Sequence, residues 1–541
     1  MLSDVFQRPR CSQRAAVPST STCSLHAAPL RRLVGRGAQH TRRHQDRDLT
    51  NHATWQTTAP ILTPSARRPS AAVPEIPVQG SAPEDVALPI FVALDKAVMN
   101  SSREMAYPEA LSAGLKALKV LGITGVSVDV HWGLVEGKEP GVYDWTGYRN
   151  LLRLISDFGF RIHVSLCFHA TPAAPLPRWV VAEGEKNPDI YYTDKAGGRS
   201  LECLTLGVND VPVLRGRTAV DVYAAFMHSF KGEFSPWFGN TITEVLVGLG
   251  PKCELKYPAH PLDSRWSYPG VGEFQCYDRF MLATLKACAD QLEQPSWGLS
   301  GPHDAGSYCL WPHQTGFFHQ HGSWTTPYGR FFMQWYSEML ARHADAVLSS
   351  ARDVFASSPL NLAVRVPGSH WWYNTASHAP ELTSGYYNTA ERDGYLPVFR
   401  ALARHRVGVH LTLAEARSRD EPAEMFCDPE RLLSQQVTVA ASQRLPVVIE
   451  NDTPRFDAAA LSRLESVLFD TVTTGAAIDV PPPAGLTFNC LTDEMFEPNN
   501  WRAFKAFVLR VRERSEAQSG RSEACAVGAD SVSQDRQTIL A

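Results

Sequence analysis

Residues 125–168 of the chain read GVSVDVHWGLVEGKEPGVYDWTGYRNLLRLISDFGFRIHVSLCF. Two apolar runs in this stretch predict buried strands, at residues 125–130 and 161–168. Between them, the apolar side chains of residues 148–158 recur with the spacing of an amphipathic helix. A strand, a helix and a second strand in this order are typical of a βαβ unit, so the stretch predicts an α/β fold with parallel strands.

The same alternation continues on both sides of this unit. Further strands are predicted at residues 88–94, 243–249, 362–366, 407–413, 446–450 and 485–489, which makes eight in all. Helical patterns lie between them, for example at residues 108–120, 221–233 and 331–348. Eight strand and helix repeats without a GxGxxG motif or a P-loop favour a single (β/α)8 TIM barrel with long βα loops over a doubly wound sheet.

The composition of the 541 residues excludes several classes of protein. The chain is 44% apolar and 10% aromatic, which is enough for a large packed core and excludes general disorder. It carries 52 Lys and Arg against 56 Asp and Glu, so no strong basic field is available to hold nucleic acid or an anionic membrane. The eleven cysteines are scattered and form no CxxC pair. We therefore expect a reducing compartment, with neither a metal site nor a disulfide framework.

The two ends of the chain differ from its middle. Residues 1–74 contain eleven Arg, no Lys and three acidic residues, and a Pro-rich linker follows. This composition is typical of an organelle transit peptide, although an ordinary disordered basic tail has similar features. We expect residues 1–87 to form this disordered leader and linker, residues 88–512 the barrel, and residues 513–541 a disordered polar tail.

The active site of a TIM barrel lies at the carboxyl ends of its strands, so the polar residues that follow each predicted strand are candidates. They are Asp95, Asp129, His169, Glu254, His370, Thr412 and Glu450. Asp129 fits a helix cap as well as a carboxylate that binds sugar hydroxyls, and a single His at a strand end is more often structural than catalytic.

Two glutamates among these residues suggest hydrolysis of a glycosidic bond. Glu254 lies in an irregular Gly- and Pro-containing loop, where it is either a general acid or a surface side chain, and Glu450 ends a strand in the segment IEND. Trp371 and Trp372 in SHWWY form either a core pair or a platform on which a pyranose ring stacks. Two carboxylates on opposite sides of a sugar are what glycoside hydrolysis requires.

The chain resembles the β-amylase family, glycoside hydrolase family 14, whose members remove maltose from the non-reducing ends of α-1,4-glucans. The resemblance covers about residues 88–512 and rests on the ordered motifs VDVHWG, YDWTGY, CFH, VGLGPKCELKYP, GEFQCYD, HWWY, ELTSGYYN, RDGY and IENDTPRFD. It implies a (β/α)8 barrel and an inverting mechanism with carboxyl groups roughly 6.5–9.5 Å apart. By position in the motifs, Glu254 matches the general acid and Glu450 the general base.

The resemblance also implies the partners and the location of the protein. The substrate would be starch or related glucans, the product β-maltose and the location the plastid stroma, and no metal or organic cofactor is implied. The charge balance described above separately argues against a nucleic-acid or membrane partner. The positions that match substrate-binding or neighbouring residues are Asp129, His169, Trp266, Arg365, His370, Trp371, Trp372, Thr412 and Asn451.

The chain departs from the family pattern most clearly after the third strand. Family members carry a Gly-rich mobile loop there, HxCGGNVGD, whose last Asp grips the substrate. The corresponding segment here, HATPAAPLPRW at residues 169–179, is shorter and has three prolines but no Gly or Asp. Because a closing loop excludes water and completes a site, its loss should weaken turnover and substrate binding.

Further departures lie in the walls of the predicted site. Arg365 replaces a subsite Lys, His410 replaces an Asn, and Cys490 takes the place of an Arg. His131, Cys253, Lys256, Ala259, His260, Pro367 and Thr453 are also unusual at their positions. We expect Cys253 to be a buried, inert thiol rather than a redox regulator.

Two interpretations of function therefore remain at the level of sequence. The retained glutamates favour an α-glucan exohydrolase, whereas the missing lid Asp favours a weak or inactive glucan-binding or regulatory protein of starch metabolism. A DNA-binding regulator fits poorly, because residues 1–87 contain no basic helix suited to a DNA groove.

Overall fold

The computed structural model of the chain describes residues 88–470 and 480–538, with side chains described as far as Gln518 of the last helix. The predicted leader and linker, residues 1–87, lie outside the described residues.

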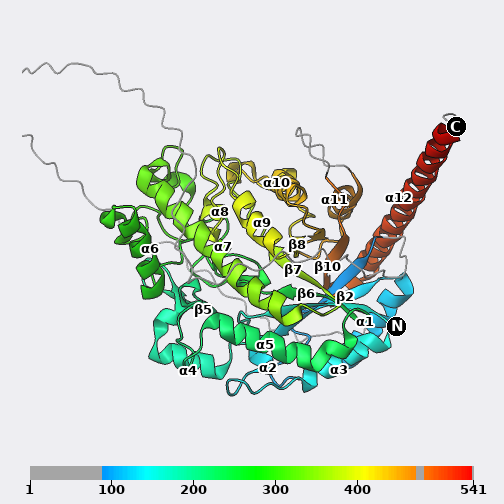
Figure 1. Cartoon of the computed structure of the whole chain (residues 1–541), viewed down its shortest axis with the longest axis horizontal. Coiled ribbons are helices and arrows are strands. Elements are labelled where there is room, and N and C mark those ends of the chain that lie inside the picture. Colours follow the sequence, from blue (N-terminus) through cyan, green and yellow to red (C-terminus); the bar gives the residue numbers. More distant parts are fainter. Residues whose placement is uncertain (1–87, 471–479, 539–541) are drawn as a thin grey trace, which may run out of the picture. The chain divides into compact units, whose positions relative to one another are not determined.

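Within the described residues, eight parallel strands close into a barrel in the order β1-β10-β9-β8-β7-β6-β3-β2 (Figure 1). The predicted (β/α)8 barrel is therefore confirmed, and every predicted strand is present with its bounds shifted by a few residues at most. The barrel strands are β1 (Ile90–Leu94), β2 (Gly125–His131), β3 (Arg161–Cys167), β6 (Ile242–Val247), β7 (Asn361–Val366), β8 (Gly408–Leu411), β9 (Val447–Glu450) and β10 (Gly485–Leu491).

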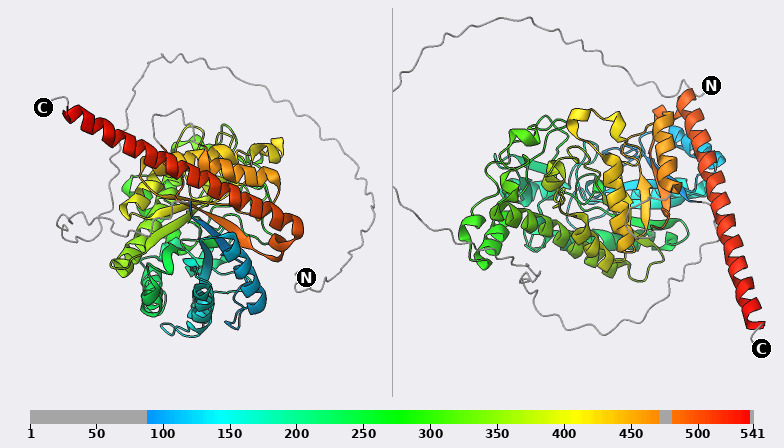
Figure 2. Two further views of the ribbon diagram at one scale, coloured as in Figure 1. Left: turned by 90° about the vertical axis from the view of Figure 1, so that its right-hand side faces the viewer. Right: turned by 90° about the horizontal axis from the view of Figure 1, so that it is seen from above.

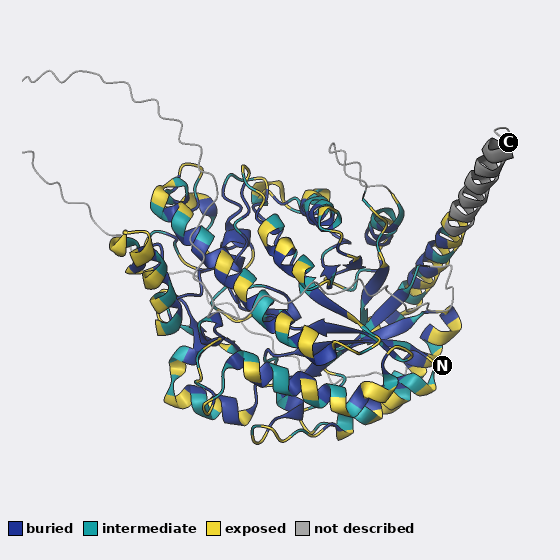
Figure 3. Cartoon of the chain, viewed as in Figure 1, coloured by how far each residue is buried: buried dark blue, intermediate teal, exposed yellow. Residues whose placement is uncertain are grey.

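Helices connect successive strands and cover the barrel. The strands are dark blue in Figure 3 because they are buried, whereas the helices carry both buried and exposed positions. The helices of three turns or more are α1 (Pro108–Leu121), α3 (Thr146–Asp157), α5 (Ala219–Phe234), α6 (Arg279–Gln291), α7 (Pro327–Phe355), α10 (Pro429–Ser442), α11 (Ala458–Phe469) and α12 (Pro498–Thr538). Shorter helices are α2 (Trp132–Val135), α4 (Arg178–Lys186), α8 (Ala379–Ser384) and α9 (Tyr395–Arg404).

Short-range sequence signals set where several helices begin. Thr218 and Asp221 form a reciprocal capping box at the start of α5. The Asp278 carboxylate accepts hydrogen bonds from the amides of Phe280 and Met281 at the start of α6. These caps bind amide groups that have no partner inside the helix, and they therefore fix the residue at which each loop ends and its helix begins.

A two-stranded antiparallel hairpin, which the sequence patterns did not predict, lies between β3 and β6. It consists of β4 (Tyr191–Thr193) and β5 (Arg199–Leu204). Its strands are too short to show a reliable alternation of apolar and polar residues. The hairpin matters for function because Glu202 on β5 reaches the candidate site described below.

The predicted boundary at residue 512 differs from the structure. Helix α12 passes through this point without a break, and Figure 2 shows it beside α11. Arg514 forms ion pairs with Glu465 of α11 and with Asp470, and the Ser515 hydroxyl accepts a hydrogen bond of 2.5 Å from the amide of Leu88. Residues 513–515 therefore belong to the packed barrel rather than to a separate tail.

No helix in the described part of the chain is both long enough and apolar enough to cross a membrane.

Candidate active site

A cavity of about 240 Å³ lies beyond the carboxyl ends of the barrel strands. Five of the site residues chosen from the sequence line it, and they come from three βα loops, those after β6, β7 and β8. These are Glu254, Trp266, His370, Trp371 and Thr412.

Glu254 is held at the cavity by an irregular turn. The turn, η4 (Pro251–Cys253), follows β6 and contains two consecutive residues in the left-handed region, Lys252 at φ 56° and Cys253 at φ 61°. This conformation is costly for residues that have a Cβ atom, and such strain is common at functional sites. Glu254 itself is 3% exposed.

Two basic residues flank the Glu254 side chain and backbone. The Lys256 ammonium group is in ion-pair contact with the Glu254 carboxylate. The backbone at Glu254 forms a parallel bridge with Arg365 of β7, in which the Leu255 amide donates to the Arg365 carbonyl over 2.9 Å. The backbone of Arg365 therefore holds in place the segment that carries Glu254.

Aromatic rings form one wall of the cavity. The rings of Trp266 and Trp371 lie 5.8 Å apart, and both indole N–H groups donate to the carbonyl of Gly270. The ring of Tyr268 packs 5.7 Å from Trp371. These three aromatic residues line the same cavity as Glu254, and aromatic rings in a sugar-binding cavity suit the C–H faces of a pyranose ring.

Trp372 does not share this wall. Its indole donates to the carbonyl of Pro269 over 2.6 Å, and its ring packs against Trp311 and Phe426. It is 2% exposed and does not line the cavity, so the two adjacent tryptophans of SHWWY have different surroundings.

His370 lies at the same cavity within a polar group. Its Nε2 is 3.3 Å from Glu421, which also accepts a hydrogen bond of 2.8 Å from the Tyr268 hydroxyl. The hydrogen bond from His370 holds the pKa of Glu421 below its ordinary value. The His370 ring lies beside the aromatic wall, 5.8 Å from the ring of Trp371.

Glu450, the second predicted carboxylate, is 1% exposed at the end of β9 and does not line the cavity. Both of its oxygens are occupied. Arg365 donates to them through Nε over 2.7 Å and through Nη2 over 3.2 Å, and His410 Nδ1 lies 2.6 Å from Oε1. Burial alone would raise the pKa of Glu450, but the charges of Arg365 and His410 hold it well below the ordinary value.

A chain of buried titratable groups continues below Glu450 inside the barrel. His410 Nε2 donates to Glu244 of β6 over 2.8 Å, and His163 of β3 lies 3.3 Å from the same carboxylate. Burial lowers the pKa of His163 to about 4. Burial acts on His410 in the same direction, but Glu244 and Glu450 on either side raise its pKa to about 9. At neutral pH, His410 is therefore protonated and donates to two carboxylates.

The remaining predicted site residues lie near the cavity without lining it. Asn451 pairs with Asn489, since its side-chain amide donates to the Asn489 carbonyl and its oxygen accepts from the Asn489 amide. The His169 ring is 5.8 Å from that of His131, and burial lowers its pKa to about 3. Asp129 is half-buried on β2.

Several cavity residues were not chosen from the sequence. Lys252, Lys256 and His260 belong to the quoted GPKCELKYPAH segment, so their departure from the family pattern could have identified them. Glu202 and Tyr268 carried no such signal, because Glu202 comes from the unpredicted hairpin and Tyr268 from a long loop.

The shortened loop after β3 is packed against the protein. The amide of Ala170 donates to the carbonyl of Glu202 over 2.8 Å, and the side chains of Ala174 and Leu176 are buried. Gly133 allows this close packing, because a Cβ atom there would lie 1.8 Å from the carbonyl oxygen of Pro175. The loop is therefore anchored at both ends and in its middle, unlike a mobile lid.

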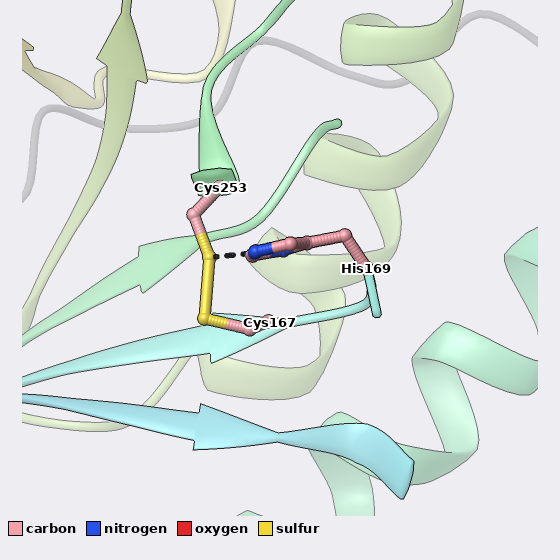
Figure 4. A group of neighbouring side chains, drawn as sticks. All are labelled: Cys167, His169 and Cys253. Carbon is pink, nitrogen blue, oxygen red and sulfur yellow. Dashed lines mark hydrogen bonds between the residues drawn. A yellow bond between two sulfur atoms is a disulfide. The ribbon is translucent and has the colours of Figure 1, made fainter. Parts of the chain in front are cut away.

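A disulfide joins Cys167 at the end of β3 to Cys253 in the turn before Glu254 (Figure 4). The expectations of no disulfide and of an inert Cys253 thiol were therefore wrong. The two Cα atoms are 5.6 Å apart, within the range that a disulfide spans. The residues are 86 positions apart and meet because β3 and β6 are neighbours in the barrel, which Cys spacing along the sequence cannot reveal.

Comparisons with known proteins agree with this architecture. The family model described as glycosyl hydrolase family 14 matches residues 90–517. The chain is 41% identical over 448 residues to the protein named beta-amylase 2, chloroplastic, of Oryza sativa subsp. japonica, covering 81% of this chain and 79% of that protein. It is 40% identical over 448 residues to beta-amylase 1, chloroplastic, of Arabidopsis thaliana, covering 81% and 77%.

A solved structure supports the fold. The crystal structure of the catalytic domain of beta-amylase from Paenibacillus polymyxa superposes with a TM-score of 0.63 at 21% identity, covering 78% of this chain and 98% of that one.

Proposed function

The chain belongs to glycosyl hydrolase family 14, and we propose from this membership and from its site that it hydrolyses α-1,4-glucosidic bonds of starch and related glucans. It releases β-maltose from non-reducing ends with inversion at the anomeric carbon. The observation that carries this proposal is the buried Glu254 carboxylate at a cavity walled by Trp266 and Trp371.

Glu254 is the general acid in this proposal, and it protonates the glycosidic oxygen as the bond breaks. Glu450 is the general base, and it takes a proton from the water that attacks the anomeric carbon from the opposite face. Arg365 links the two sides, since its backbone pairs with Glu254 and its guanidinium group binds Glu450.

In this proposal, the matched residues that line the cavity bind the glucan directly, and the others act from outside the cavity lining. The glucan contacts the residues that line the cavity, with sugar rings stacked on Trp266 and Trp371 and hydroxyl groups bound by His370 and Thr412. The other matched positions support the cavity from behind or meet the glucan at its rim. They are Asp129, His169, Arg365, Trp372 and Asn451.

A second candidate function is glucan binding with little or no turnover. The observation that favours it is the occupation of both Glu450 oxygens by Arg365 and His410. A carboxylate held by two cations is a weak base, and it has to release one partner before it can accept a proton. The packed loop after β3 also favours glucan binding without turnover, because it contains no Asp to bind the substrate.

Maltose release separates the two candidates. The full chain is incubated with soluble starch or maltoheptaose, and proton NMR follows the anomer formed, with Glu254→Gln as the blank. Fresh β-maltose that is absent from the blank establishes the inverting exohydrolase. No product above the blank, together with saturable binding of maltoheptaose, establishes the glucan-binding protein instead.

The plastid stroma is the location that fits this substrate. The relatives described above are named chloroplastic, and residues 1–74 are rich in Arg and poor in acidic residues. A fusion of residues 1–87 to a fluorescent protein should enter plastids, and a nuclear signal would contradict this proposal and favour a nucleic-acid partner.

A further inference from the structure

Three buried side chains with metal-binding atoms meet beside the proposed acid. Cys167 and His169 come from the end of β3, and Cys253 comes from the turn that precedes Glu254 (Figure 4). One ligand atom from each lies within 4.8 Å of those of the other two, and His169 Nδ1 is 3.8 Å from Cys253 Sγ. All three side chains are at least nine-tenths buried.

These residue types suit a particular class of cation. Thiolate sulfur and neutral imidazole nitrogen are preferred ligands of Zn²⁺ and related thiophilic cations, and two Cys with one His leave one position of a tetrahedral site open. The Nδ1 atom of His169 already faces the Cys253 sulfur at 3.8 Å, so the imidazole nitrogen and the two sulfur atoms lie close enough to bind one ion.

We propose that, once the Cys167–Cys253 disulfide is reduced, the two sulfur atoms and His169 Nδ1 bind one thiophilic divalent cation such as Zn²⁺. An external dithiol or phosphine supplies the two electrons that break the S–S bond, and two protons complete the thiols while the reductant is oxidised. Each thiol then releases its proton as its sulfur binds the cation. The disulfide form has no thiolate to offer, so oxidation and cation binding exclude each other.

Two other groups of side chains within the described residues are less suitable. His163, Glu244 and His410 already form an ion-paired network in which His410 carries protons on both nitrogens. In the group of His370, Glu421 and Cys427, the carboxylate accepts a hydrogen bond from Tyr268 and is partly exposed.

The test uses Co²⁺ as a spectroscopic probe. The full chain is reduced anaerobically with a phosphine, stripped of metal with a chelator, desalted and titrated with Co²⁺. We expect one equivalent to bind, with visible d–d bands and near-ultraviolet sulfur-to-metal charge transfer, and Zn²⁺ to displace it. The unreduced protein should show neither band, and this comparison requires no substitution.

Variants assign the ligands. Cys167→Ser and Cys253→Ser should abolish the charge-transfer band, and His169→Gln should weaken binding by about tenfold or more. Cys276→Ala removes a buried thiol outside the cluster and serves as the matched control, which should bind like the wild type. No uptake by reduced wild-type protein whose free thiols have been counted would overturn the proposal, as would unchanged bands in both Ser variants.

The consequence for activity rests on the proposed hydrolysis and is measured separately. A cation bound here holds His169 and the turn before Glu254, so Zn²⁺ should slow maltose release by reduced protein and have no effect on the disulfide form. If the protein releases no maltose at all, the Co²⁺ titration still decides the binding proposal.

Discussion

Arg365 stands where the family pattern has a Lys, and this replacement changes the surroundings of Glu450. The planar guanidinium group binds both carboxylate oxygens at once, whereas an ammonium group is a compact point charge. A carboxylate held in this way is less able to accept a proton from water.

The substitution Arg365→Lys should therefore increase turnover. We expect kcat for maltose release to rise by about threefold to tenfold, equivalent to roughly 1 kcal/mol, because Glu450 loses the bidentate contact and gains basicity. Steady-state kinetics with maltoheptaose measure kcat and KM separately. Arg400→Lys, on the exposed face of α9, is the matched control. An unchanged kcat with a raised KM would instead assign Arg365 to substrate binding.

His410 makes the stability of the barrel depend on pH. Its pKa is raised from 6.5 to about 9, so the folded state holds its proton more tightly than the unfolded state. This contribution to stability is complete below pH 6.5 and is lost as the pH rises through about 9.

Comparison with the variant His410→Asn tests this dependence. The free energy of unfolding of the wild type, relative to His410→Asn, should fall by roughly 3 kcal/mol between pH 6 and pH 9.5, at 1.36 kcal/mol per pKa unit. Urea unfolding at several pH values gives this difference, and His228→Asn, at an exposed position on α5, is the control. A difference between wild type and His410→Asn that does not vary with pH would contradict the raised pKa.

The loop after β3 is the element that departs furthest from the family. Its backbone is bonded to Glu202, its middle is buried, and Gly133 lies directly beneath it. This packing explains how the barrel accommodates a short, proline-rich segment, and it leaves the cavity without the cover that excludes water in a closing site.

Replacement of residues 170–177 by the family's Gly-rich loop with its terminal Asp should raise kcat/KM for maltoheptaose by about tenfold, because closure positions the substrate. The same graft ending in Ala instead of Asp is the control and separates the effect of cover from that of the carboxylate. If neither graft increases activity, the limiting defect lies in other departures from the family pattern, such as Arg365 and Cys490.

At the scale of the whole molecule, α12 secures the point where the barrel begins. Four of its own side chains, Phe504, Phe507, Val508 and Val511, are fully buried. Beyond residue 512, Arg514 pairs with α11 and Ser515 accepts from the amide of Leu88, just before β1. The last helix therefore links the end of the barrel to its first strand.

A chain that ends at residue 512 should be less stable than one that ends at residue 518. The shorter chain loses the Arg514 ion pairs and the Ser515 hydrogen bond, which together contribute about 1 kcal/mol. Thermal unfolding of the two truncated proteins measures the difference, with the full chain as reference. Equal Tm values for both truncations would show that the barrel ends before residue 513.

Local patterns were sufficient to predict the barrel and the positions of the two glutamates. Apolar runs such as residues 125–130 define strands, helical periodicity defines the segments between them, and a residue that follows a strand must lie at the carboxyl end of the barrel. These features depend on neighbours within a few positions, so Glu254 and Glu450 could be placed at the carboxyl ends of barrel strands from the sequence alone.

Tertiary structure decided which side chains contact Glu450 and which residue is bonded to the turn before Glu254. Arg365 and His410 reach Glu450 across 85 and 40 positions of sequence, and Cys167 reaches Cys253 across 86. These contacts exist because β7, β8 and β9 lie side by side and β3 lies next to β6. Their physical reason is barrel closure, which brings side chains from distant strands into one desolvated volume where charges and thiols must find partners.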